Sequence, residues 1–286
     1  MYCSGDLFAG DVVRPYNDSQ GQPIVQKGLA NAQSALDWVV AQTQNGGLAS
    51  TFTDVVVMGC SAGSLASQLW SKQVMTTLKW NQGAVVPDSY AGVFPAGSVG
   101  PLVYSYGFCS SGFLSDELKS KCLDQTLSLE EILVEFASAI PTVPFNYLQS
   151  KVDWCQQAFY DSVGASMDPP HKPTTPTQFY TDTNTVFGTY NSKLKNFVTY
   201  LMDGEQHCFT CYDLFYTADA KGATDNNTTN TGLTLASWVA QLPLAQGESI
   251  STSCEGQTTS GDKMQLPTDN TYCASVVYPK EFVENY

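Results

Sequence analysis

The chain has 286 residues and a mass of 31.0 kDa, a length typical of one or two domains, and its 43% of hydrophobic residues is enough for a sizeable core. Its 13 Lys and Arg stand against 27 Asp and Glu, and the resulting net charge of −14 argues against nucleic acid and anionic lipid surfaces as partners. No apolar run approaches the roughly 18 residues that a membrane span needs.

The cysteine count and the glycosylation sequons point to an extracellular protein. There are nine cysteines, and sequons begin at Asn17, Asn226 and Asn227. We therefore expect a secreted glycoprotein, although the sequence shows no signal peptide. It opens on MYCSGDLFAGD, which reads as the end of a strand followed by a polar loop, so we expect that N-terminal strands of the domain are missing from this chain.

Nine is an odd number, so at least one cysteine lacks an internal partner, and Cys3 is the candidate. Two local bridges are plausible, Cys109 with Cys122 and Cys254 with Cys273. The sequence cannot fix their connectivity. The C-x-x-C pair at residues 208–211 has no second pair at zinc-site spacing and no thioredoxin-like surroundings, so we do not expect a metal there.

The first predicted elements are a helix, a strand and a second helix. Residues 26–44 carry apolar side chains at helical spacing and are followed by two glycines. The apolar run Val55–Met58 predicts a short strand buried on both faces. Residues 62–78 then read as a helix.

The turn between this strand and the second helix has the G-x-S-x-G pattern of a nucleophile elbow. Ser61 stands between Gly59 and Gly63, and we expect that neither glycine position has room for a Cβ. Ser61 is the candidate nucleophile. The backbone N–H of Ala62, at the positive end of the helix, is the candidate oxyanion donor.

Further strands and helices alternate along the chain. A strand ends near Asp88, and residues 127–139 form a helix with Ser128 and Glu131 as a capping box. Strands follow at residues 143–148 and 195–204. This alternation, without a repeat or a linker, predicts an α/β fold with a mostly parallel central sheet flanked by helices, in a single domain over residues 1–286.

A serine hydrolase needs a base and an acid, and the chain has only two histidines. His171 lies in a proline-rich loop, whereas His207 follows a late strand, as the α/β-hydrolase chain order requires of the base. Asp153 follows a strand between the nucleophile and the base, and is the candidate acid. Asp88 comes too soon after the elbow helix, so we interpret it as structural or as a contact to substrate.

Several segments together resemble the pectin acetylesterase and Notum carboxylesterase family. They are YCSGDLFAGD, GCSAGSLA, PDSYAGVF, FNYLQSKVDWCQ and DGEQHCFTCYD, in the family's order. The resemblance implies Ser61, Asp153 and His207 as the catalytic triad of a secreted, α/β-hydrolase-like esterase with no metal or cofactor. Two features depart from the family. Ser64 stands where a second glycine is usual, and the Gly-rich segment that supplies oxyanion donors lies upstream of the residues present.

The resemblance implies an acetylesterase acting on an acetylated polysaccharide. We expect it to be a monomer. The net charge of −14 opposes binding to polyanionic pectin unless salt or low pH screens it, so a neutral acetylated glycan fits better. Two alternatives stay open. One is a lipid or protein O-deacylase, which needs a deep apolar pocket, and the other is a non-catalytic glycan-binding protein.

Overall fold

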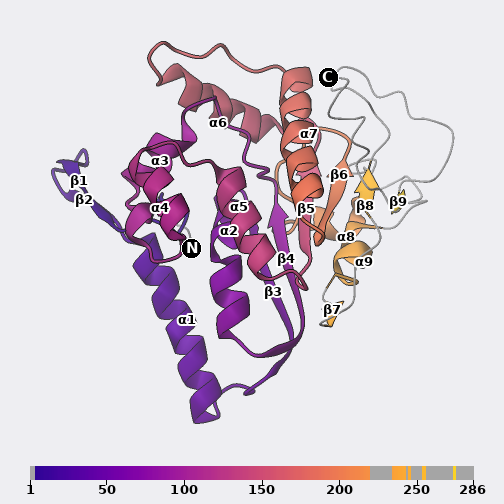
Figure 1. The fold of residues 1–286 in the computed structure, drawn as a ribbon. Helices are drawn as coiled ribbons and strands as arrows, with labels where there is room; N and C mark the ends of the chain where they lie inside the picture. The colour runs from indigo at the N-terminus through magenta and orange to yellow at the C-terminus, as the bar shows by residue number, and fades with distance from the viewer. Residues whose placement is uncertain (1–3, 220–233, 243, 246–252, 256–272, 275–286) are drawn as a thin grey trace.

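A parallel sheet forms the centre of the fold in the computed structural model, which describes residues 4–219, 234–242, 244–245, 253–255 and 273–274 (Figure 1). The strands of this sheet are β3 (Phe52–Cys60), β4 (Trp80–Asp88), β5 (Phe145–Ser150), β6 (Phe197–Met202), β7 (Leu244–Ala245), β8 (Ser253–Glu255) and β9 (Cys273–Ala274). The path β3-β4-β5-β6-β8 is parallel throughout, β9 is antiparallel to β8, and β7 pairs antiparallel with β4. The predicted α/β class with a mostly parallel sheet is confirmed.

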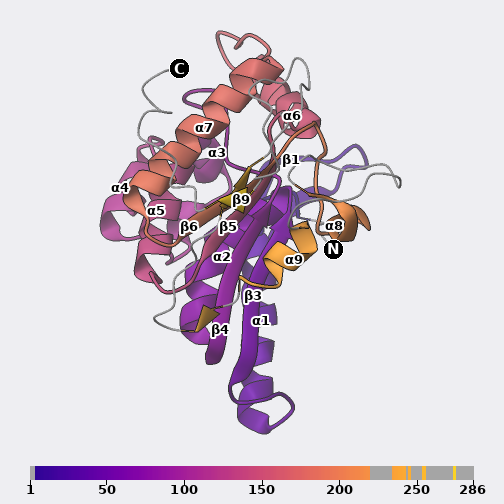
Figure 2. The same ribbon diagram turned by 90° about the vertical axis from the view of Figure 1, so that its right-hand side faces the viewer.

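Helices cover both faces of this sheet. They are α1 (Gly28–Asn45), α2 (Ala62–Thr77), α3 (Val99–Ser105), α4 (Asp116–Leu123), α5 (Leu129–Ala139), α6 (Trp154–Ala165), α7 (Pro176–Lys193), α8 (Leu214–Thr217) and α9 (Leu235–Val239), with a 3-10 turn, η1 (Phe108–Ser110). Figure 2 shows α5 and α7 on one side of the sheet, with α8 and α9 on the other. A separate two-stranded hairpin, β1 (Val12–Asn17) with β2 (Pro23–Gln26), precedes α1. None of the described helices is long and apolar enough to cross a membrane.

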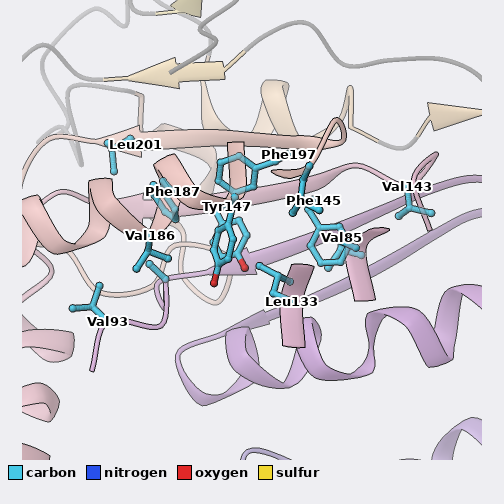
Figure 3. Packing of buried hydrophobic residues seen from close by; sticks show 14 of the residues in the cluster. Val85, Val93, Leu133, Val143, Phe145, Tyr147, Val186, Phe187, Phe197 and Leu201 are labelled. Carbon is cyan, nitrogen blue, oxygen red and sulfur yellow. The ribbon is translucent and has the colours of Figure 1, made fainter. Parts of the chain in front are cut away.

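The main core lies between the sheet and the layer of α5 and α7 (Figure 3). Tyr147 from β5 is fully buried there, and its ring stacks on Tyr190 with centroids 5.7 Å apart. Phe187 and Phe197 pack around the same ring at 5.4 and 5.5 Å. Aromatic pairs at such distances add about 0.5–1.5 kcal/mol each beyond area burial, so this cluster fixes α7 against β5 and β6.

The opposite face of the sheet is covered over β4, β5 and β6 but not over β3. Tyr200 of β6 packs on Trp238 of α9 with ring centroids 5.1 Å apart. On β3 the side chains of Val56 and Met58 remain 42% and 48% exposed, while Val55 and Val57 face the main core. The expectation that this strand is buried on both faces is therefore wrong, because α8 and α9 do not extend over it.

Most of the other predicted elements are confirmed. The helix α2 begins at Ala62, α1 ends before Gly46, whose φ of 79° is the left-handed C-cap that favours glycine, and α5 has the full Ser128–Glu131 capping box. The hairpin and the helices α3, α4, α6, α7, α8 and α9 were not predicted. Whether residues 1–286 form a single domain stays a prediction.

The structure also tests part of the predicted disulfide pairing. Cys109 and Cys122 form the expected disulfide between η1 and α4. Residues 254 and 273 are directly opposite each other in the β8–β9 ladder, although their side chains, like Cys3, lie outside the described part of the structure. A second disulfide, which was not predicted, joins Cys60 to Cys208.

Because the strands run parallel, the loops that follow β3, β4, β5 and β6 all emerge at one edge of the sheet. These loops begin at Ser61, Ser89, Lys151 and Asp203. The buried ion pair between Lys151 and Asp203, with Nζ and Oδ1 3.1 Å apart, joins the last two of them. The fold thus brings to one edge the residues that the sequence spreads over about 150 positions.

Candidate active site

Ser61 is the N-cap residue of α2 and follows β3 directly. Its φ of 58° and ψ of −119° lie in a region that residues with a Cβ rarely adopt. Its backbone N–H donates to the carbonyl of Asp88 at 2.9 Å, which holds the turn against the end of β4. This is the strained strand-to-helix turn that the predicted nucleophile elbow requires.

The two glycines of the elbow differ in what they require. A Cβ on Gly59 would lie 2.2 Å from the carbonyl oxygen of Gly63, so only glycine fits at position 59. A Cβ on Gly63 would meet nothing within 4 Å. The expectation that a side chain would not fit is confirmed for Gly59 and wrong for Gly63. Gly63 contributes the backbone carbonyl that leaves no room for a Cβ on residue 59.

Asp153 is the N-cap of α6 and is fully buried. Its Oδ1 accepts the backbone N–H of Gln156 at 2.9 Å, and its Oδ2 accepts the Gln156 side-chain amide at 2.8 Å. The Gln156 amide also donates to Gln149 on β5 at 3.0 Å. The carboxylate is therefore held in one orientation, at a helix N-terminus that favours negative charge.

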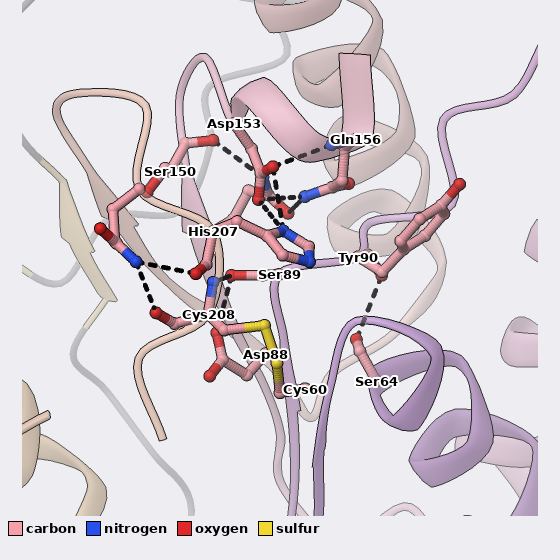
Figure 4. A network of polar contacts seen from close by, with 12 residues as sticks. Cys60, Ser64, Asp88, Ser89, Tyr90, Ser150, Asp153, Gln156, His207 and Cys208 are labelled. Atoms are coloured by element: carbon pink, nitrogen blue, oxygen red, sulfur yellow. Dashed lines mark hydrogen bonds and ion pairs between the residues drawn. A yellow bond between two sulfur atoms is a disulfide. The ribbon is translucent and has the colours of Figure 1, made fainter. Parts of the chain in front are cut away.

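His207 completes a hydrogen-bonded pair with this carboxylate. Its Nδ1 lies 2.8 Å from Oδ2 and 3.0 Å from Oδ1 of Asp153 (Figure 4). With Nδ1 engaged by an acceptor, Nε2 is the ring nitrogen that can take a proton from a nucleophile. The structure thus brings together the predicted acid and the predicted base, which are 54 positions apart in the sequence.

The loop that carries His207 is fastened to the end of β4. Oδ2 of Asp88 accepts the backbone N–H groups of Phe209 and Thr210, each at 2.8 Å. The hydroxyl of Ser89 accepts the N–H of Cys208 at 2.8 Å and donates to Asp88 at 2.8 Å. Asp88 is fully buried, so of the two roles considered for it the structural one fits.

A disulfide ties the same loop to the elbow. Cys60, which precedes Ser61, is bonded to Cys208, which follows His207, with Cα atoms 5.6 Å apart. The two bonded cysteines are 148 residues apart. The only sequence signal was their adjacency to the two candidate catalytic residues, and local spacing gave no means of pairing them.

Ser61, Ala62 and His207 line one cavity of about 200 Å³. Its wall opposite the elbow is aromatic, with the Phe94 ring 5.4 Å from that of Tyr90 and 6.0 Å from that of Phe159. Burial, with a smaller contribution from the charge of Asp153, raises the pKa of the Tyr90 hydroxyl well above its usual value, so this phenol is neutral at physiological pH. The cavity is thus largely apolar, and Ser61, Gln156 and His207 are among the polar residues that line it.

The remaining residues considered from the sequence lie elsewhere. The backbone N–H of His171 donates to Gly164 of α6 at 3.0 Å, and His171 does not line this cavity. Ser64 is fully buried, and its hydroxyl donates to the carbonyl of Tyr90 at 3.3 Å. Ser64 therefore leaves the approach to the helix N-terminus unobstructed by its side chain.

A second, larger cavity of about 730 Å³ also has Phe94 in its lining. It contains two carboxyl groups, Glu130 of α5 and Asp182 of α7. Burial raises the pKa of each, although Lys193 acts against the shift at Glu130 and a hydrogen bond from Gln178 acts against it at Asp182. Phe94 is thus shared by the cavity beside Ser61 and the cavity that contains the two carboxyl groups.

Comparisons with known proteins give matches among solved structures only. No protein-family model matches the chain, and no curated protein matches it. Two crystal forms of the Wnt deacylase Notum from Drosophila, at 1.9 and 2.4 Å, match with TM-scores of 0.47 and 0.44 and identities of 16% and 18%. The matches cover 77% and 76% of this chain and 63% and 61% of those chains, so the matched region spans about three fifths of their length. Similarity at this level carries no information on activity.

Proposed function

We propose that this protein is a serine carboxylesterase that removes short acyl groups, acetyl foremost, from an acetylated polysaccharide. The observation that carries the proposal is the hydrogen bond of 2.8 Å between His207 Nδ1 and Asp153 Oδ2, in a cavity that Ser61 also lines. A nucleophile, an acid and a base in this order along the chain of an α/β fold are the constellation used for acyl transfer.

The proposed reaction gives each of these groups a role. Ser61 Oγ attacks the ester carbonyl while Nε2 of His207 takes its proton, and Asp153 stabilises the imidazolium that forms. The N–H of Ala62, in the first turn of α2, has no partner inside the helix and donates to the oxyanion. His207 then protonates the leaving sugar hydroxyl, and water releases the acyl group from Ser61 by the same route.

The size of the cavity favours a short acyl group. Its 200 Å³ is below the roughly 300–1,000 Å³ of sites that take drug-sized ligands. Leu65, Leu102 and Phe159 in its wall offer an apolar surface to a methyl or short alkyl group. A long-chain lipid or protein deacylase requires a deeper pocket than this one.

We assign a polysaccharide as the alcohol part of the ester because of the family resemblance and the charge of the chain. With a net charge of −14, the protein repels polyanionic glycans at low salt, which favours a neutral acetylated glycan. Secretion is supported by the two disulfides, since such bonds persist in oxidising compartments. A monomer and the absence of a cofactor are further parts of the proposal.

The test is hydrolysis of p-nitrophenyl acetate by the parent protein, Ser61→Ala and His207→Ala. We expect each variant to lose roughly 10⁶-fold in kcat if the serine and the histidine act as one unit. His171→Ala is the matched control, because it removes the other histidine, and it should keep the parent rate. A folded parent protein no faster than Ser61→Ala would contradict the proposal and leave a glycan-binding role.

Two further comparisons of substrates distinguish the possible classes of natural ester. Acetate release from acetylated xylan, which is mostly neutral, should exceed release from acetylated pectin at low salt, and the difference should shrink as salt is added. A preference for p-nitrophenyl octanoate over the acetate would favour a lipid or protein deacylase instead.

A further inference from the structure

Three sulfur atoms meet beside the catalytic edge of the sheet. The Sγ atoms of Cys60, Cys208 and Cys211 lie within 4.8 Å of one another. Cys60 and Cys208 are bonded, and the free thiol of Cys211 lies 3.7 Å from the sulfur of Cys60. Cys211 is exposed, so a thiol in contact with a disulfide is also open to solvent.

This arrangement is what thiol–disulfide exchange requires. A thiolate attacks one sulfur of a disulfide, and the other sulfur leaves as a thiolate. We propose that Cys60 exchanges partners: the Cys211 thiolate attacks Sγ of Cys60, the Cys60–Cys211 bond forms, and the Cys60–Cys208 bond breaks. Cys208 leaves as a thiolate and takes up the proton that Cys211 lost. One disulfide and one thiol are present before and after, so the step needs no oxidant or reductant.

The environment of Cys211 makes this exchange slow at neutral pH. Burial and the nearby negative charge of Asp88 raise the pKa of the Cys211 thiol, while a backbone hydrogen bond acts in the opposite direction. The thiol is therefore largely protonated at pH 7, and only the thiolate attacks. The Cys60–Cys208 bond therefore persists at pH 7, although the Cys211 thiol is in contact with it.

Exchange changes what holds the base. In the structure the tether from the elbow reaches the residue next to His207, and after exchange it reaches Cys211, four positions from His207. Asp88 still binds Phe209 and Thr210 between these two positions. The segment that carries His207 then has one constraint fewer, and because this consequence rests on the proposed function, we expect kcat to fall by about tenfold in the exchanged form.

The deciding experiment maps the disulfides directly and does not depend on activity. The parent protein is incubated at pH 7, 8 and 9 without added thiol, quenched in acid, alkylated with N-ethylmaleimide, and digested under non-reducing conditions. We expect a Cys60–Cys211 peptide whose rate of appearance rises about tenfold between pH 7 and 8, as the thiolate fraction does. A protein that keeps only Cys60–Cys208 at pH 9, with Cys211 fully alkylated, would overturn the proposal.

Two variants each allow only one of the two disulfides of Cys60. Cys211→Ser locks the Cys60–Cys208 bond and should show neither the new peptide nor a slow loss of activity at pH 9. Cys208→Ser leaves Cys211 as the near partner of Cys60, and its digest should contain the Cys60–Cys211 peptide. If the parent protein forms that peptide but no variant hydrolyses any ester, the exchange stands and the proposed function fails.

Discussion

Oδ2 of Asp88 accepts both the backbone N–H and the hydroxyl of Thr210, each at 2.8 Å, although the two residues are 122 positions apart. The same oxygen accepts the N–H of Phe209 at 2.8 Å. A buried carboxylate at the end of β4 thus accepts three hydrogen bonds from the loop that carries His207. The position of the proposed base depends on this carboxylate as well as on Asp153.

Replacing Asp88 by Ala should therefore lower activity and stability together. Leaving buried donors unpaired costs about 1–3 kcal/mol each, so we expect the free energy of unfolding in urea to fall by at least about 2 kcal/mol. We expect kcat on p-nitrophenyl acetate to fall by about 10- to 100-fold, with a smaller change in KM, because the base and not the cavity is displaced. Thr210→Val removes only one of the three hydrogen bonds and should give a smaller loss of both. Equal kcat in Asp88→Ala and the parent would show that the disulfide alone holds the loop.

The sequence predicts well those elements whose signals are local. The capping box of α5 needs only Ser128 and Glu131, three positions apart, and it forms as expected. The strands β5 and β6 are short and buried on both faces, and β6 is mostly apolar. The candidate triad also came from local signals, since each member follows a strand, and parallel strands bring such residues to one edge.

The elements that were missed depend on distant contacts. The helix α7 is rich in Thr and Asn, which have low helix propensity, and is held by burial of Phe179, Phe187 and Tyr190 against the sheet. The exposed face of β3 depends on where α8 and α9 lie, which its own residues do not encode. The Cys60–Cys208 bond joins residues 148 positions apart, so no spacing rule could have found it.

The two glycines of the elbow provide a test of its geometry. Gly59→Ala places a Cβ 2.2 Å from the carbonyl oxygen of Gly63, which must shift, and overpacking of this kind costs about 1–3 kcal/mol. We expect a lower Tm for this variant. Gly63→Ala adds the same methyl group into open space within the first turn of α2, so its Tm should be unchanged or slightly higher. Thermal unfolding followed by circular dichroism compares them, and equal losses of Tm would contradict the asymmetry.

The two carboxyl groups of the larger cavity should make stability depend on pH. Burial raises the folded-state pKa of Glu130 and of Asp182, so the folded protein binds these protons more tightly than the unfolded chain. Their contribution to stability is therefore fully present below the unfolded pKa of about 4 and is lost as pH rises through the folded-state pKa. At pH 7, Glu130→Gln and Asp182→Asn should each raise Tm.

The same variants should leave Tm nearly unchanged at pH 3.5, where the parent carboxyl groups are largely protonated in both states. The control is Asp54→Asn on the exposed part of β3, which also removes one negative charge from a chain of net charge −14. It separates the effect of burial from the relief of general repulsion. If Glu130→Gln and Asp182→Asn raise Tm at pH 7 no more than Asp54→Asn does, burial of the two carboxyl groups does not lower the stability.

Phe94 should limit the acyl length that the proposed esterase accepts. It lines both the cavity of about 200 Å³ beside Ser61 and the cavity of about 730 Å³. We expect Phe94→Ala to open the first cavity toward the second, so that an octanoyl chain gains room to be buried. Burying two more methylene groups at about 0.8 kcal/mol each amounts to roughly tenfold, and we expect the ratio of kcat/KM for octanoate to that for acetate to rise by at least this factor.

Phe113→Ala is the matched control for this change. Phe113 is a half-buried ring that packs on Trp70 with centroids 4.8 Å apart and lines neither cavity. It should cost stability, as Phe94→Ala does, without altering the ratio between the two esters. A ratio that rises in both variants would point to general loosening of the fold, and a ratio that rises in neither would mean that the acyl chain does not approach Phe94. A rise confined to Phe94→Ala would place the acyl group in the cavity beside Ser61.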